Sequence, residues 1–170
     1  MISPLVQKDD GDRVENLKLY QIHGTASEID YDHIAKMASS ICECPISLVS
    51  FIDGKRQWFK ASVGTNLKEN TRELALCSHT INDIKNTTYI PDTTKDIRFK
   101  HHPIVNGPAN IKFYAGVPII SPEGYALGTI CVMDHQAKRL KQAQLNALIH
   151  LRDLTQDILA IRRAKLESKC

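Results

Sequence analysis

Two pairs of apolar segments, each joined by a short turn, most constrain how this chain can fold. The first pair is Ile46–Ile52 and Arg56–Ala61, on either side of Asp53-Gly54, two residues that tolerate the positive φ of a tight hairpin turn. The second pair is Ile111–Ile120 and Tyr125–Met133, which flank a turn containing Pro and Gly. Strands that follow each other this closely pair antiparallel, because a parallel connection needs a long crossover. We therefore expect an antiparallel sheet built on two hairpins.

Helical patterns lie outside these hairpins. Val14, Leu17 and Tyr20 recur at three-residue spacing and predict a short helix that stops before Gly24. A second helix is expected to end before Pro45, which cannot continue it. The inner face of that second helix is predicted to consist of Ile34, Met37, Ala38 and Ile41.

The C-terminal segment predicts one long helix, because the chain has neither Pro nor Gly from Gln136 onward. One apolar face is marked by Leu145, Leu148, Ile149 and Arg152. A second stripe alternates three- and four-residue spacings and consists of Leu140, Ala147, Leu151, Leu154, Ile158 and Ile161. One stripe can pack on the domain, and the other predicts a partner helix and hence a homodimer. The alternative is a single wide apolar face on one packed helix.

Between the hairpins the pattern is less regular. We expect a short helix over Arg72–Ile84 and a short strand over Thr88–Ile90, followed by irregular segments around His101-His102-Pro103. The element order predicts an α+β fold, with helices on one face of an open antiparallel sheet and irregular segments on the other. Irregular segments over a sheet commonly enclose small-molecule sites.

Composition narrows the classes of partner. The chain has 170 residues and 22 basic against 19 acidic side chains, a net charge of +3. This length suits one domain, and so small a charge does not favour nucleic acid as a partner. The apolar stretches are shorter than the roughly 20 residues of a membrane span, and the N-terminus lacks the pattern of a signal peptide. We expect a cytoplasmic protein without a membrane partner.

Cysteine and histidine are the residues most able to carry chemistry. The five cysteines cannot all pair within one chain, and Cys131, inside an apolar strand pattern, is interpreted as a small hydrophobic residue. Cys42 and Cys44 are too close in sequence for a usual pair of zinc ligands, so no metal site is predicted. Cys77 and His79 would diverge on a helix, which argues against a catalytic pair. We therefore assign no catalytic residue.

Five segments, in order along the chain, resemble motifs of bacterial GAF domains. They are Cys44–Asp53 followed by Arg56–Lys60; Thr71-Arg72-Glu73 with Cys77-Ser78-His79; Pro91-Asp92 with Asp96–Phe99; Ile111–Ile119; and Leu127–Asp134. Together they cover roughly residues 14–160 in register. Several long motifs in the correct order are far more specific than any one of them.

The resemblance implies a GAF-like fold, with a central antiparallel sheet of about six strands, helices on one face and a ligand pocket on the other. It divides the chain into a flexible tail (1–12), a GAF domain with its terminal helix (13–160), and the end of a signalling helix with a C-terminal tail (161–170). Relatives of this kind are input domains ahead of histidine kinases, diguanylate cyclases and phosphodiesterases. The implied function is signal transduction: the domain senses a small molecule and passes a shift to its C-terminal helix. The sequence requires no cofactor.

The expected ligand-binding residues are Trp58, Arg72, Cys77, His79, Asp96, Arg98, Phe99 and Tyr114. Two other hypotheses remain open. One is a thiol-based reductase of a small molecule, acting through Cys77 with Cys42 or Cys44. The other is a haem- or bilin-binding sensor that uses His79 or Cys77, although Ser78 separates a Cys and His that are often adjacent in bilin-binding relatives.

Overall fold

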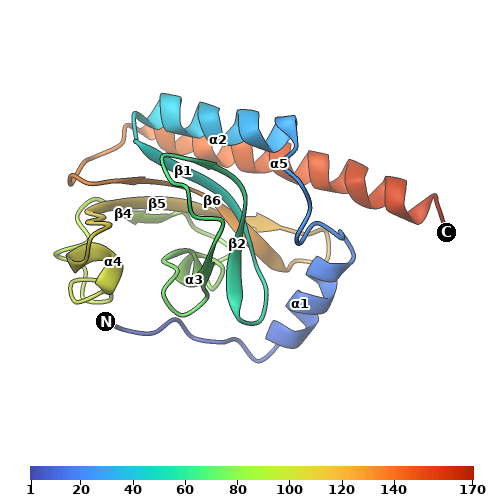
Figure 1. Ribbon diagram of the computed structural model, residues 1–170, viewed down its shortest axis with the longest axis horizontal. Coiled ribbons are helices and arrows are strands. Elements are labelled where there is room, and N and C mark those ends of the chain that lie inside the picture. The colour runs from blue at the N-terminus through green and yellow to red at the C-terminus, as the bar shows by residue number, and fades with distance from the viewer.

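The two hairpins form the centre of one sheet. In the computed structural model, which describes residues 1–170, β1 (Ile46–Ile52) pairs with β2 (Arg56–Val63), and β5 (Phe113–Ile120) pairs with β6 (Ala126–Asp134). β1 and β6 pair antiparallel and join the hairpins. The short edge strands β3 (Glu69–Thr71) and β4 (Thr88–Ile90) complete the order β3-β2-β1-β6-β5-β4 (Figure 1). The expected antiparallel sheet of about six strands is confirmed.

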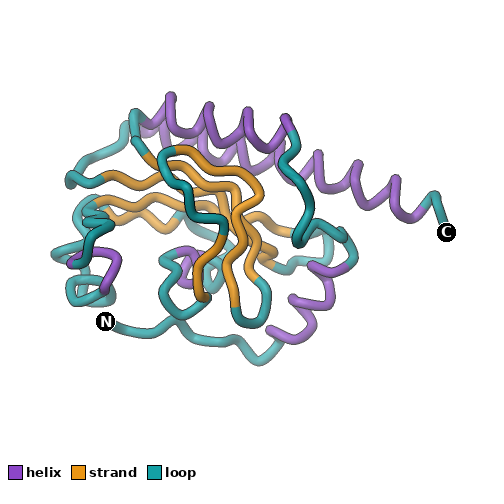
Figure 2. Tube along the Cα trace, viewed as in Figure 1, coloured by secondary structure: helices purple, strands orange, loops and turns teal.

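The two long helices cover one face of this sheet. α2 (Ile29–Cys42) and α5 (Gln142–Glu167) run side by side above it, and the C-terminal part of α5 extends beyond the sheet (Figures 1 and 2). α1 (Asp10–Lys18) lies at one end of the sheet, beside β6. The opposite face carries loops and the single-turn helices α3 (Cys77–Thr80) and α4 (Pro103–Asn106). None of the helices has the length and apolar character needed to cross a membrane.

Strand alternation produces two separate apolar cores, because successive side chains of a strand point to opposite faces. On β1, Val49 and Phe51 pack under α2 and α5, whereas Leu48 and Ile52 belong to the core on the other face. The sheet is buried on both sides, so β1, β5 and β6 are mostly apolar instead of alternating between apolar and polar residues.

A β-bulge in β2 changes the direction of one side chain. Val49 is opposite Ala61 and Ser50 is opposite Phe59, which leaves Lys60 without a partner residue. The Lys60 side chain is fully buried on the helix side, where its ammonium group contacts Glu28 at 2.5 Å. The bulge thus places a cation between β2 and the start of α2.

The structure corrects the extent of one predicted helix and the buried face of another. Only Cys77–Thr80 is helical within the predicted helix Arg72–Ile84, because the backbone on either side closes turns of i to i+3 spacing, such as Ala75 N–H to Arg72 O and Asp83 N–H to Thr80 O, in place of the i to i+4 bonds of an α-helix. The inner face of α2 is rotated: Met37 and Ile41 are each 41% exposed. The residues buried there are Tyr31, Ile34, Ala35, Ala38 and Cys42.

The buried face of α5 also differs from either predicted stripe. It consists of Leu148, Leu151, Thr155 and Leu159, one residue from the first predicted stripe, one from the second, and two from neither. Leu154 and Ile161 from the second stripe are 50% and 56% exposed. The helix therefore has a packed face and a separate apolar face directed to solvent. Helix α1 begins at Asp10, inside the segment assigned to the tail.

Candidate functional site

A cavity of about 100 Å³ lies on the sheet face that α2 and α5 leave open. Its floor comes from β1, β2, β5 and β6, and its walls come from the segment Ala75–Cys77 and from α4 with the loop after it. The lining is mostly apolar: Ile46, Leu48, Gln57, Phe59, Thr65, Leu67, Asn70, Ala75, Leu76, Cys77, Ile104, Ala109, Ile111, Tyr114 and Met133. Leu67 and Ala109 are exposed, so the cavity opens between the β2–β3 loop and the loop after α4.

One end of this cavity is a buried group of polar and sulfur atoms. The Cys77 and Cys131 sulfurs lie 3.6 Å apart, although the residues come from α3 and β6. The Tyr114 hydroxyl donates a hydrogen bond to the Cys77 sulfur at 3.3 Å. The Thr80 hydroxyl is 2.7 Å from the Tyr114 oxygen and can donate to it. All four side chains are buried, which makes each hydrogen bond costly to lose.

This arrangement separates the pKa values of the two thiols. Burial raises the pKa of Cys77, but its side-chain hydrogen bonds with Cys131, Thr129 and Tyr114 outweigh burial and leave its pKa below the ordinary value. The pKa of Cys131 is raised, because it is the hydrogen-bond partner of Cys77 and is itself buried. Cys77 is therefore the more easily ionised thiol of the pair.

A second polar layer continues beside the thiols. Gln57 donates to the Ser50 hydroxyl at 2.9 Å, and the Ser50 and Thr129 hydroxyls are 3.2 Å apart. Gly116 leaves room for this region, because a Cβ at that position would overlap the Tyr114 hydroxyl. The site thus combines an apolar body with a hydrogen-bonded polar end.

Of the eight expected binding residues, the structure places Cys77 and Tyr114 on the cavity. Trp58 lies on the opposite face of the sheet, packed against the helix-side core near His23. Phe59 lines the cavity instead. Strand alternation separates these two aromatic residues but does not say which of them faces the helices.

Four other expected residues form a group beside the cavity. His79 packs edge-on against Phe99, with 4.8 Å between the ring centres. The Arg98 guanidinium lies over the Phe99 ring, 4.8 Å from its centre, and also pairs with Asp96. Burial, with the nearby Arg98, lowers the pKa of His79 to about 4. His79 is therefore a neutral ring at physiological pH.

Arg72 lies in an ion network away from the cavity. It pairs with Asp10 through two hydrogen bonds of 2.6 and 2.7 Å, and Asp10 also accepts from Arg13. Arg13 in turn donates to the carbonyls of Ile52 and Ala126. The network attaches α1 to the ends of β1 and β6.

Sequence reasoning missed several residues of the site. Gln57 and Phe59 share a strand face, so their i, i+2 spacing was a usable signal once the direction of Trp58 was known. Thr80 and Cys131 carry no such signal, because their contact depends on how α3 crosses the sheet. The structure does not bring together the thiols of the alternative reductase hypothesis: Cys42 and Cys44 belong to the helix-side core, and the sheet separates them from Cys77.

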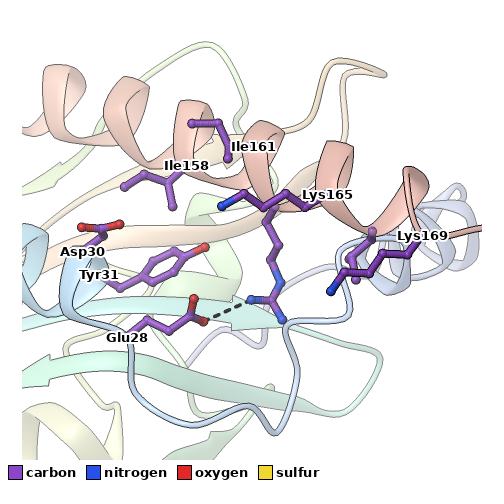
Figure 3. A pocket seen from close by; sticks show the side chains of 9 residues that line it. Glu28, Asp30, Tyr31, Ile158, Ile161, Lys165 and Lys169 are labelled. Atoms are coloured by element: carbon purple, nitrogen blue, oxygen red, sulfur yellow. Dashed lines mark hydrogen bonds and ion pairs between the residues drawn. The ribbon is translucent and has the colours of Figure 1, made fainter.

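A second cavity, of about 330 Å³, lies between α2 and the C-terminal half of α5. Figure 3 shows Lys165, on α5, and Lys169, just beyond the C-terminal end of α5, across from Glu28, Asp30 and Tyr31. Arg162 pairs with Glu28 at 3.1 Å. The Tyr31 hydroxyl is buried without a hydrogen-bond partner. This cleft lies on the helix pair rather than on the sheet face with Cys77.

Comparison with known proteins agrees with this architecture. The family model described as GAF domain matches residues 30–155. A cyclic di-GMP phosphodiesterase of Pseudomonas aeruginosa is 37% identical over 108 residues, which cover 64% of this chain but only 18% of that protein.

Two solved structures show the same fold at low identity. The GAF domain of an Acinetobacter phosphoenolpyruvate-protein phosphotransferase superposes with a TM-score of 0.66 at 16% identity, covering 94% of this chain and 97% of that one. A type II free methionine-R-sulfoxide reductase from Thermoplasma acidophilum gives 0.59 at 14% identity, covering 83% and 94%.

Proposed function

This chain belongs to the GAF domain family, and on that premise we propose that it is a cytoplasmic sensory domain that binds a small molecule in the cavity beside Cys77 and Tyr114. The observation that carries the proposal is the cavity itself, an apolar space with a hydrogen-bonded polar end. Apolar pockets with a few convergent polar groups are the usual form of small-molecule sites.

The size of the cavity restricts its ligand. At about 100 Å³ it is smaller than the roughly 150 Å³ apolar cavity that accepts benzene. A ligand must therefore have a short apolar body with one polar group, or displace the wall formed by α4. Ile104 is the half-exposed residue of α4 at this wall, so motion of α4 would enlarge the space.

The test uses NMR titration with phenol, an apolar ring with one hydroxyl, which is larger than benzene and therefore binds only when α4 moves outward and enlarges the cavity. Phenol should shift the amide signals of Cys77, Ile104 and Tyr114 in a saturable manner. The variant Ile104→Trp should lose these shifts, because the larger side chain fills the mouth of the cavity.

The matched control is Ile97→Trp, which enlarges a 70% exposed residue that does not line the cavity. This variant should bind phenol like the original protein. Shifts that are absent from Cys77 and Tyr114, or that survive in Ile104→Trp, would contradict the proposed site.

The second part of the proposal is that α5 transmits the effect of ligand binding. This helix contacts the sheet through Leu148, extends beyond it, and carries the exposed apolar residues Leu154 and Ile161. We propose that α5 pairs with the same helix of a second copy and transmits the effect of binding, since a ligand acts only by favouring one arrangement over another. The phosphodiesterase relative supports an output in cyclic di-GMP turnover. A histidine kinase, which the motif resemblance also implies, is the other output class that we propose.

A further inference from the structure

The thiols of Cys77 and Cys131 form a close pair at the polar end of the cavity, where oxidation could join them. Disulfide bonds need two sulfurs from suitably placed backbone segments to approach to about 2.05 Å. The Cys77 and Cys131 sulfurs are already 3.6 Å apart, and no other residue separates them. Both residues are buried, so they meet through the fold and not through chance surface contact.

We propose that Cys77 and Cys131 form a reversible oxidation site, in which a small hydroperoxide that enters the cavity converts the two thiols to a disulfide. The site is independent of the ligand class proposed above, because the reaction requires only the two sulfurs and access through the cavity. Cys77 is the residue that meets the oxidant, since it lines the cavity and Cys131 does not.

The access of the oxidant to Cys77 and the reactivity of the Cys77 thiol both favour oxidation of Cys77 before Cys131. A liquid water molecule occupies about 30 Å³, so a cavity of about 100 Å³ accommodates hydrogen peroxide. The thiolate is the reactive form of cysteine, and the lowered pKa of Cys77 favours it. The Tyr114 hydroxyl, at 3.3 Å, stabilises the same anion.

The reaction balances in two steps. The Cys77 thiolate attacks the terminal oxygen of the hydroperoxide, the O–O bond breaks, and the leaving oxygen takes up a proton to become an alcohol or water. Cys77 is then a sulfenic acid. The Cys131 sulfur attacks the Cys77 sulfur, the S–O bond breaks, and the hydroxyl leaves as water with the Cys131 thiol proton. Two thiols have lost two electrons, and one O–O bond has gained them. An added dithiol reverses the disulfide by exchange.

The other cysteines provide internal controls. Burial raises the pKa of Cys42 to about 11 and that of Cys44 to about 12, which makes both poor nucleophiles. Neither borders the cavity. Cys170 is exposed and can react with peroxide, but it lies at the C-terminus, in a different tryptic peptide.

The experiment treats the reduced full chain with hydrogen peroxide, blocks the remaining thiols with N-ethylmaleimide under denaturing conditions, and digests with trypsin. The expected product links the peptide 73–85 to the peptide 113–138, because each contains only one cysteine, Cys77 or Cys131. Two of the five thiols should become unavailable to the label through this link. Dithiothreitol should remove the link and restore both.

Three variants decide between this reaction and indiscriminate oxidation. Cys44→Ser should form the link like the original protein. Cys131→Ser should form no link, and its Cys77 should instead be trapped by dimedone as a sulfenic acid. Cys131→Ala repeats this test without a buried hydroxyl, and circular dichroism confirms that each variant is folded. A folded protein whose Cys77 stays reduced, or whose links are spread equally over Cys42 and Cys44, would overturn the proposal.

Discussion

Asp10 holds two guanidinium groups that the fold removes from water. The Arg13 and Arg72 side chains are each 7% exposed, and both donate hydrogen bonds to this one carboxylate, which is 13% exposed. Arg13 also binds carbonyl groups at the ends of β1 and β6. Arg72, expected from its sequence motif to contact a ligand, is thus occupied by a structural network.

We predict that Asp10→Asn is strongly destabilising at neutral pH. Removing one partner of a buried ion pair costs about 3–5 kcal/mol, because the remaining charges stay buried and poorly compensated. Urea denaturation should show the loss as a lower midpoint. Glu15→Gln is the matched control: the Glu15–Lys18 pair has the same spacing but is 70% and 65% exposed, so its removal should change the free energy of unfolding by less than about 0.5 kcal/mol.

The original protein and the Asp10→Asn variant should differ in how their stability depends on pH, because only the original protein has the Asp10 carboxylate. Burial opposes its ionisation, but hydrogen bonds and charges from Arg72 and Arg13 lower the pKa of Asp10 below its ordinary value of 3.8. A lowered folded-state pKa gives stability that is present above the unfolded pKa and is lost as pH falls through the folded value. The stability difference between the original protein and Asp10→Asn should therefore be constant at neutral pH and shrink only below about pH 4. A difference that stays constant down to acid unfolding would contradict this origin.

At the scale of elements, the sequence predicts a helix or strand reliably where hydrophobic patterning and turn residues determine it. β1, β5 and β6 are recoverable from their apolar runs, because both faces of these strands are buried, and β2 is recoverable from the turn that follows β1. The turn after β1 forms as expected, although its conformation differs: Gly54 does not adopt a positive φ, and the Asp53 side chain accepts from the backbone of Lys55 and Arg56 instead.

Elements that depend on packing are less predictable. The buried faces of α2 and α5 are rotated from the expected ones, because Met37 and Leu154 are apolar residues on outward faces. β3 has only three residues and forms by pairing with β2, so no local sequence pattern predicts it. Within the site, Cys77 and Tyr114 were predictable from motifs, whereas the partner Cys131 depends on a contact between α3 and β6.

The pairing of β1 with β6, which joins the two hairpins, leads to a prediction about one glycine. Gly128 of β6 lies opposite Phe51 of β1, and a Cβ at this position would overlap the Ser50 carbonyl and lie 2.8 Å from the Phe51 Cα. Gly128→Ala should cost at least the roughly 1–3 kcal/mol of overpacking, since backbone atoms cannot move aside as a side chain can. Gly54→Ala, where nothing lies within 4 Å of the added Cβ, should be nearly neutral. Thermal unfolding of both variants measures the difference, and equal melting temperatures would refute the argument.

At the scale of the whole molecule, the sheet separates the cavity from the pair of long helices. The face with Cys77, Cys131 and Tyr114 encloses the cavity, whereas the other face holds α2 and α5 and their exposed apolar residues. β6 connects them physically, because its Cys131 side chain reaches the cavity side while Ile130 and Val132 pack on the helix side. β6 leads through residues 135–141 into α5, and this is the route by which we propose that a change at the cavity floor reaches that helix.

The exposed side of α5 supplies the last prediction. Leu154 and Ile161 are seven residues apart, the spacing of equivalent positions in paired helices, and are 50% and 56% exposed. We expect the chain to form a homodimer through this face, detected by sedimentation velocity over a wide range of concentrations. Ile161→Glu should shift the equilibrium towards monomer, because pairing would bury a carboxylate on each helix. Ile97→Glu introduces the same charge at a 70% exposed residue on the loop side of the molecule and should leave the dimer intact. A protein that sediments as a monomer throughout, or a dimer weakened equally by both substitutions, would show that α5 is not the interface.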